Sequence, residues 1–280
     1  MSATTSAAGG GGLRPWLLLA PLLVFLAAFF IVPLAQVAVM SVSDPEWGLD
    51  HYVAIATDGF HLRVLLDTFL TALTVSLCCL VLGFPLAYAM AAAPPGLAAA
   101  MMVVVTMSFW TSFLVRTYAW MVLLGNRGPI ARFVEWIGFA SPELLFTRFS
   151  STVAMTHILL PYMVLSLYGV LKRIEPSLPR SAASLGATPA GVIRHVVLPL
   201  AAPGIANGLT LVFVLCLGFY VTPILLGSPR EQMVASVIGQ QVEEFLAFGE
   251  ASAMAVVLLA STLIILGIYH RRFGLDRLWG

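Results

Sequence analysis

The chain has 280 residues, of which 60% are hydrophobic and only 10% are charged, and its formal net charge is +1. Soluble globular domains average about 25% charged residues, so this chain has too little polar side chain to cover the surface of a soluble domain. Lipid tolerates such an apolar surface, and the near-neutral charge gives no indication of a nucleic-acid partner. The composition therefore predicts an all-α integral membrane protein.

Six apolar stretches are long enough to cross a bilayer, which takes about 20 residues in helical form. They lie at 16–39, 68–91, 99–124, 152–171, 205–227 and 252–269. The first stretch exceeds the roughly 7–15 apolar residues of a secretory signal, so we expect it to remain as a span. The expected organisation is a transmembrane domain at 16–272 between an N-terminal tail at 1–15 and a C-terminal tail at 273–280.

The distribution of basic residues predicts that both termini are cytoplasmic. With this orientation, eight lysine and arginine residues lie inside, five lie outside, and Arg116 lies within the third span. The excess on the inner side agrees with the positive-inside rule. The inner residues are Arg14, Lys172, Arg173, Arg180, Arg194, Arg271, Arg272 and Arg277, and the outer residues are Arg63, Arg127, Arg132, Arg148 and Arg230.

The inner loop at about 172–203 has the composition of two short helices joined by a bend. Ser177 is expected to cap the first helix, because its hydroxyl can accept a bond from a free backbone N–H. Gly186 is expected to end this helix, since glycine reaches left-handed backbone angles without a steric penalty. The residues expected to form a small, smooth surface before the bend are Ala182, Ala183 and Leu185.

The second short helix is expected to begin at Thr188 and Pro189, an N-cap residue followed by proline in the first helical position. Pro199 is expected to close this helix before the fifth span. Two short helices at a glycine bend suit docking in a cleft of another cytoplasmic protein. A linker that lies along the membrane surface is the alternative interpretation.

This loop resembles the EAA loop in permeases of binding-protein-dependent ABC importers. The family pattern is Glu-Ala-Ala, three residues, Gly, and a run that ends near Ile-x-Leu-Pro. The matching residues are Ala182, Ala183, Gly186, Ala187, Val196, Val197, Leu198 and Pro199. Ser181 stands where the family usually has glutamate, so a carboxylate contact with the ATPase would be weaker here or supplied by another residue.

Further segments extend the resemblance to the spermidine/putrescine branch of these permeases. They lie at 83–88, 109–120, 159–163 and 218–223. The resemblance implies a bacterial inner-membrane permease that binds two copies of a cytoplasmic ABC ATPase, a second permease subunit and a periplasmic solute-binding protein. It implies no cofactor on this chain, with ATP and Mg²⁺ bound by the ATPase. Other small organic cations, amino-acid-like solutes, thiamine and metal chelates are alternative solutes.

Polar and aromatic residues within the spans are the candidates for the pathway or gate. Arg116 can snorkel outward, pair structurally or line the pathway. Trp110, Tyr118 and Trp120 can form an interfacial belt or line a cation route through cation–π contacts. Asn207, Phe219 and Tyr220 lie on the fifth span, which lines the pathway by resemblance, whereas their spacing alone equally favours helix packing. Pro223 can kink the outer end of that span.

His157 and the acidic residues of the last outer loop each have a structural and a functional interpretation. His157 in the fourth span is expected to be a hydrogen-bonded packing residue rather than part of a proton relay, because no second titratable group accompanies it. The last outer loop is acidic, and it is either a solvated loop, a docking surface for a binding protein or a source of negative potential that favours a polycation. Its acidic residues are Glu231, Glu243, Glu244 and Glu250.

The sequence lacks the parts that competing classes of protein need. An ion-coupled secondary transporter needs carboxylates within the membrane or a discontinuous helix pair, and every Asp and Glu lies in a predicted loop or near a span end. An intramembrane enzyme would need a motif such as HExxH or GxSxG. No P-loop pattern occurs, so the sequence predicts a transport subunit without enzymatic activity whose ATPase is a separate chain.

Overall fold

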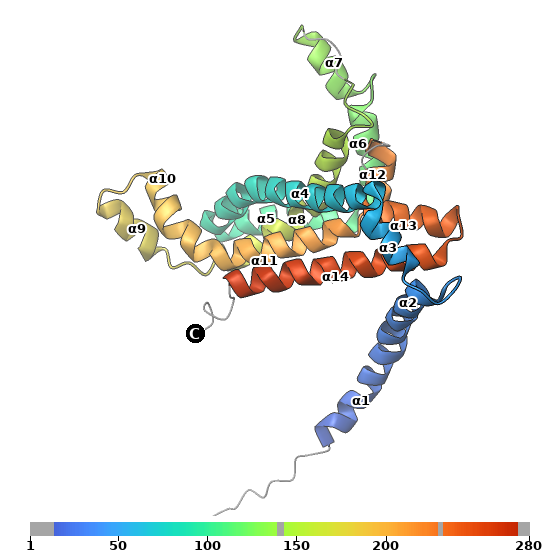
Figure 1. Cartoon of the computed structure of the whole chain (residues 1–280). Helices are drawn as coiled ribbons and strands as arrows, with labels where there is room; N and C mark the ends of the chain where they lie inside the picture. Colours follow the sequence, from blue (N-terminus) through green and yellow to red (C-terminus); the bar gives the residue numbers. More distant parts are fainter. Residues whose placement is uncertain (1–13, 139–142, 229–231, 274–280) are drawn as a thin grey trace, which may run out of the picture.

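The computed structural model describes residues 14–138, 143–228 and 232–273, and all regular secondary structure in these residues is helical (Figure 1). The predicted tails fall outside this part of the chain, except for positions 14, 15 and 273. The elements are α1 (Arg14–Leu26), η1 (Ala27–Ile31), α2 (Val32–Ser43), α3 (Asp50–Thr57), α4 (Gly59–Ala92), α5 (Pro95–Trp110), α6 (Phe113–Leu124), α7 (Pro129–Trp136), α8 (Arg148–Leu171), α9 (Ser177–Ser184), α10 (Pro189–Val192), η2 (Ile193–Val197), α11 (Leu198–Leu217), α12 (Val221–Leu226), α13 (Val234–Glu243) and α14 (Phe248–Phe273).

The core of the molecule is a bundle in which α4, α8 and α11 pack against one another. Apolar residues from all three helices are fully buried there, including Val75, Met90, Met155, Leu159, Met163 and Val212. In Figure 1 α14 runs alongside this bundle, while α9 and α10 project from one end and α3 and α13 cover the other. The elements that we assign to the two sides of the membrane therefore lie at opposite ends.

Among the described residues, five helical segments are long and apolar enough to cross a membrane. The segments are Leu19–Ser43, Gly59–Ala92, Arg148–Leu171, Pro189–Leu217 and Phe248–Tyr269. A sixth span is reached if the helices at Pro95–Trp110 and Phe113–Trp136, which are bent by 96°, count as one. The prediction of an all-α, multi-pass membrane protein is therefore confirmed.

The structure corrects two predicted spans that it breaks into separate helices. The stretch at 99–124 is interrupted at Thr111 and Ser112, whose extended ψ angles of 128° and 136° cannot continue a helix. The stretch at 205–227 is interrupted between Leu217 and Val221. The kink expected at Pro223 is wrong in position, because Pro223 lies inside α12 and the chain bends before it.

A second correction concerns Pro199, which does not close the second short helix. Helical structure instead continues from Pro189 to Leu217, through the π-helical turn η2. In this turn the hydrogen bonds skip one more residue, as in the bond from the Leu198 N–H to the Ile193 carbonyl. Pro199 follows directly in the first turn of α11, where its missing N–H is tolerated because the bonding pattern has already shifted.

The first span projects away from the bundle. In Figure 1 α1 extends beyond the other helices, and α2 meets α14 near the end that carries α3 and α13. Its apolar side chains are exposed, as shown by Phe29 and Phe30, which are 71% and 68% exposed. Apolar surface of this extent is compatible with lipid and not with water.

Polar contacts tie the helices together at the end that carries α3 and α13. His61 near the start of α4 lies 2.9 Å from a carboxylate oxygen of Asp58 and 3.1 Å from one of Glu250. The amide of Gln241 donates to the same Glu250 oxygen at 2.9 Å. One carboxylate on α14 thus joins α4 to α13, so the end of the bundle is held by a shared polar cluster as well as by apolar packing.

Close contact between α8 and α11 depends on two glycines four residues apart, Gly204 and Gly208. A Cβ on Gly204 would lie 2.9 Å from Val170 Cγ2 and 3.0 Å from Val170 Cβ, and one on Gly208 would lie 2.6 Å from Met163 Sδ. Small residues at this spacing let membrane helices approach closely, since no side chain separates the backbones. Gly204 therefore sets the distance between the two helices.

We expect Gly204→Val to lower the thermal unfolding midpoint of the purified chain by several degrees. The added side chain overpacks the contact with Val170, which costs about 1–3 kcal/mol in a well-packed core. Gly169→Val is the matched control, because Gly169 lies on α8 and a Cβ there meets nothing within 4 Å. Equal midpoints for the two variants in the same detergent would contradict this account of the interface.

Candidate functional site

The bend predicted at Gly186 is present and has a defined hydrogen-bonding pattern. Gly186 has a φ of +89°, in the left-handed region that favours glycine. The Gly186 N–H donates to the Ala183 carbonyl at 3.0 Å, and the Ala187 N–H donates to the Ala182 carbonyl at 3.1 Å. This pair of bonds is a Schellman motif, which satisfies carbonyl groups at the end of α9. The two alanines of the EAA-like pattern are thus the backbone acceptors of the bend.

The second half of this elbow (residues 177–197) is anchored to the bundle. The Thr188 hydroxyl accepts from the Gly191 N–H at 3.2 Å, which confirms the predicted N-cap, and Pro189 is the first helical residue. Val192 and Val197 are buried in the core formed with α4, α8 and α11. The elbow is therefore attached to the spans through α10 and η2, so a force on it would be transmitted to α11.

The first half of the elbow is mostly exposed. Leu185 at its tip is 89% exposed, and Ser181, Ala183 and Ala187 are also exposed, while Ala182 is partly buried. The predicted cap at Ser177 is wrong, because Pro176 holds the N-cap position and Ser177 is the first helical residue.

The structure divides the EAA-like pattern between the exposed elbow and the start of α11. Its first part lies on the exposed elbow, whereas Leu198 and Pro199 begin α11 and lie beyond the π-helical turn. Both residues are exposed.

The two breaks in the spans meet at one cavity of about 510 Å³. The break between α5 and α6 contributes residues 109–113 and Arg116, and the end of α11 contributes Leu215 and Phe219. Helix α8 forms the third wall with Ile158, Leu159 and Tyr162. Three of the predicted pathway residues, Trp110, Arg116 and Phe219, are thereby brought together. Phe109 and Tyr162 also line the cavity, and neither was predicted as a pathway residue. Their rings pack edge to face with centroids 4.9 Å apart.

Arg116 is the only charged residue among the described residues that line this cavity. Its Nη1 donates to the Ser108 hydroxyl at 2.8 Å, across the break between α5 and α6. Its Nε is buried and has no hydrogen-bond partner within the described part of the chain. The side chain therefore pairs structurally, as one of the predictions proposed, and also presents an unused donor beside the cavity.

The remaining pathway candidates lie elsewhere. Trp110 lines the cavity although it is 91% exposed, whereas Tyr118 and Asn207 are exposed on α6 and α11 and are not among the described residues that line this cavity. Tyr220 lies between α11 and α12 and packs against α13, where a Cβ on Gly239 would be 3.7 Å from its ring. Its carbonyl accepts a long bond of 3.5 Å from the Ser236 hydroxyl.

His157 has the packing role that was predicted for it. The Trp120 indole N–H donates to His157 Nδ1 at 3.2 Å, and the two rings meet edge to face. Within the described residues there is no group of three His, Cys, Asp or Glu side chains that could hold a metal ion. Among the acidic residues of the last outer loop, Glu231 lies outside the described residues, and Glu243, Glu244 and Glu250 lie at the end that carries α13.

The discontinuous helices were not expected from the sequence, and one argument against a secondary transporter is thereby lost. The other argument still applies, because no Asp or Glu is among the described residues that line the cavity at the breaks. A cation bound at such a break is coordinated by backbone carbonyls and by the C-terminal ends of the half-helices. The cavity instead carries one fixed cation and several aromatic rings.

Comparisons with known proteins relate this arrangement to transport permeases, although no family model matches the chain. The spermidine/putrescine transport system permease protein PotB of Haemophilus influenzae is 30% identical over 197 residues, covering 69% of this chain and 68% of PotB. PotB of Escherichia coli (strain K12) is 28% identical over 228 residues, covering 80% of this chain and 82% of PotB.

The fold is also found in a solved structure. A chain in the crystal structure of a bacterial alginate ABC transporter, in complex with an alginate pentasaccharide-bound periplasmic protein, has a TM-score of 0.73 and 22% identity, covering 93% of this chain and 96% of that one. The fold, the span pattern and the identity to PotB agree with one another. The chain therefore belongs to the PotB family of ABC transporter permeases of the inner membrane.

Proposed function

We propose that this chain is a permease subunit of an ABC importer that moves polyamines, putrescine or spermidine, into the cytoplasm. The observation that carries the proposal is the similarity to the Escherichia coli spermidine/putrescine permease over 82% of that protein. A periplasmic binding protein delivers the solute to the outer end of the spans, and a second permease completes the pathway. This chain binds no cofactor.

The elbow at residues 177–197 is the element that we assign to coupling with the ATPase. Its exposed tip, with Leu185 and the small residues Ser181, Ala183 and Ala187, suits a cleft in a cytoplasmic protein. Two ATPase copies bind ATP and Mg²⁺, one against each permease. Six spans with both termini in the cytoplasm place the elbow on the side where ATP is available. Because Val192 and Val197 are buried in the bundle, movement of the elbow is transmitted to α11.

In this proposal the cavity at the two breaks is part of the solute pathway. The faces of Trp110, Tyr162 and Phe219 attract an ammonium group by about 0.5–2 kcal/mol each, depending on desolvation. Arg116 acts in the opposite direction, since like charges about 4 Å apart repel by about 4 kcal/mol at an effective dielectric constant of about 20. The combination binds a polyamine weakly, as a transport pathway requires for release.

A second candidate solute is favoured by Arg116 itself. Its buried Nε lacks a partner in the described residues, and a carboxylate on the solute could accept this hydrogen bond. The same importer class would then carry an amino-acid-like compound. The two candidates differ in the sign of the charge that the cavity prefers, so the effect of Arg116 on transport separates them.

The proposal is tested by ATP-dependent uptake of labelled putrescine, spermidine and a panel of amino acids. Cells would express this chain with the ATPase, permease and binding protein encoded beside it. Uptake of a polyamine that requires all four proteins supports the proposal. Assembly of the four proteins with uptake of another solute only would refute the polyamine assignment and retain the importer class.

Gly186→Val is expected to abolish most of the uptake while the protein remains in the membrane. A branched side chain at a φ of +89° is strained although a Cβ there meets nothing within 4 Å, so the elbow itself must change shape. Gly186→Asn is the matched control, because asparagine tolerates left-handed angles. Co-purification of the ATPase should be lost with valine and largely retained with asparagine. Normal uptake by the valine variant at normal expression would contradict the coupling assignment.

Arg116→Gln is expected to lower the KM for polyamine uptake, because it removes the repulsion between the fixed cation and the solute. The glutamine amide can still donate a hydrogen bond to the Ser108 hydroxyl, so a hydrogen bond across the break is retained. Arg116→Lys, which keeps the charge, is the control and should leave the KM higher than in the glutamine variant. If uptake of a carboxylate-bearing solute is instead lost in Arg116→Gln, the second candidate is correct.

A further inference from the structure

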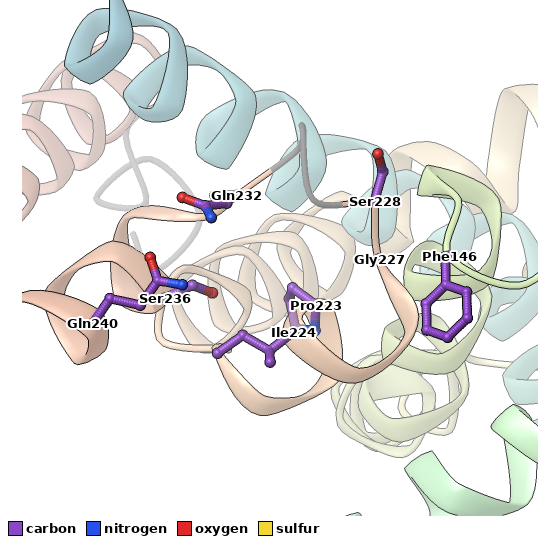
Figure 2. A pocket seen from close by; sticks show the side chains of 8 residues that line it. All are labelled: Phe146, Pro223, Ile224, Gly227, Ser228, Gln232, Ser236 and Gln240. Carbon is purple, nitrogen blue, oxygen red and sulfur yellow. The ribbon is translucent and has the colours of Figure 1, made fainter. Parts of the chain in front are cut away.

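A small pocket of about 200 Å³ lies between α12 and α13, at the end of the bundle that we assign to the outer side. Figure 2 shows its two kinds of wall. Phe146, Pro223, Ile224 and Gly227 form the apolar part, and Ser228, Gln232, Ser236 and Gln240 contribute polar groups. A volume below the roughly 300 Å³ of pockets for drug-sized ligands suits only one end of an extended solute.

Three polar residues of the pocket wall are evenly spaced along the chain. Gln232, Ser236 and Gln240 follow one another at intervals of four residues, so the two on α13 share a helix face and Gln232 enters from just before it. Figure 2 shows these three side chains on the same side of the pocket, opposite Pro223 and Ile224. The pocket therefore presents two carboxamides and a hydroxyl toward an apolar wall.

The two carboxamides are available to a ligand. No hydrogen bond joins the side chain of Gln232 or Gln240 to another described residue, whereas the neighbouring Gln241 is occupied by its bond to Glu250. Each carboxamide carries a carbonyl oxygen that can accept from an ammonium group. No charged side chain is among the described residues that line the pocket.

The wall of this pocket contacts the chain segment that lines the membrane cavity. Ser236, in the pocket wall, donates to the carbonyl of Tyr220 at 3.5 Å. The next residue toward the N-terminus, Phe219, lines the cavity at the two breaks. One hydrogen bond and one peptide bond thus link the wall of the pocket to the wall of the cavity.

We propose that the pocket formed by Gln232, Ser236 and Gln240 is a carboxamide-lined transfer subsite that binds one ammonium group of the solute between its release outside and its entry into the cavity. The inference rests on the proposed polyamine function and adds a site to it. Amide oxygens replace part of the water around the ammonium without the strong attraction of a carboxylate. Binding is then strong enough to orient the cation and weak enough to release it.

The test is the kinetics of spermidine uptake by the complete four-protein importer. Gln240→Leu removes the carbonyl oxygen with little change in size, and it should raise the KM about tenfold to a hundredfold, the effect of one hydrogen bond to a charged group. Gln240→Glu should have the opposite effect on the KM and lower the maximal rate, because a carboxylate holds the cation longer. Gln36→Leu removes an exposed carboxamide on α2, which does not line the pocket, and should leave the KM unchanged.

Each outcome decides the inference. If Gln240→Leu leaves the KM unchanged, or if Gln240→Glu raises it as leucine does, the subsite is overturned while polyamine uptake by the unmodified importer still supports the proposed function. If the unmodified importer carries no polyamine, both fail together. Should Gln240→Leu not assemble with the ATPase, Gln232→Leu is measured in its place, and the same increase in KM is expected.

Discussion

The satisfaction of backbone hydrogen bonds in lipid is the constraint on which the rest of this structure depends. A helix satisfies its own N–H and C=O groups, and irregular backbone at membrane depth is tolerated only where protein or a cavity covers it. The chain interrupts two spans, at Thr111–Ser112 and between Leu217 and Val221, and both interruptions face the same cavity. The irregular backbone of these spans is thus concentrated at one place, which is also where Arg116 and several aromatic side chains meet.

The two ends of the bundle are specialised by different physical means. The end with α3 and α13 is held by a shared carboxylate, Glu250, and by an apolar cluster between helices. The opposite end carries an elbow whose shape follows from a single left-handed glycine and whose base is buried. Between them, Gly204 and Gly208 bring α8 and α11 into close contact. The elbow and the cavity are therefore joined by one helix, α11, which begins beside the first and ends at the second.

The sequence predicted what depends on local chemistry. Composition and apolar length predicted the all-α membrane fold, and the preferences of Gly186 and Thr188 predicted a bend followed by a capped helix. The close approach at Gly204 and Gly208 could also have been found, because small residues four apart on an apolar helix are a known packing signal. The π-helical turn that makes Pro199 part of a continuous helix has no comparable signal in the sequence.

The break at Thr111–Ser112 and the cavity could not be predicted, for a physical reason, whereas Gly218 marks the second break as a helix end. No glycine or proline marks Thr111 and Ser112, and both residues are exposed, so no local preference accounts for their extended backbone. The cavity combines residues from α5, α6, α8 and α11, and no spacing along the chain shows that Arg116, Tyr162 and Phe219 are neighbours. Tyr118 and Asn207 are exposed, and this too depends on how the helices pack rather than on the local sequence. The set of residues that line the cavity is thus determined by the tertiary packing of the helices rather than by local preference.

In the proposed function, the solute passes through the cavity at which the two broken spans meet. This passage is tested most directly by placing a cysteine at Phe219 in a chain whose native Cys78, Cys79 and Cys216 are replaced, and by measuring its reaction with a small thiol reagent in the assembled importer. The account predicts that spermidine delivered by the binding protein slows this reaction during ATP turnover, and that a cysteine at Gly169, on the exposed face of α8, is unaffected. Equal rates with and without spermidine at the Phe219 position, in a complex that still imports it, would contradict the account.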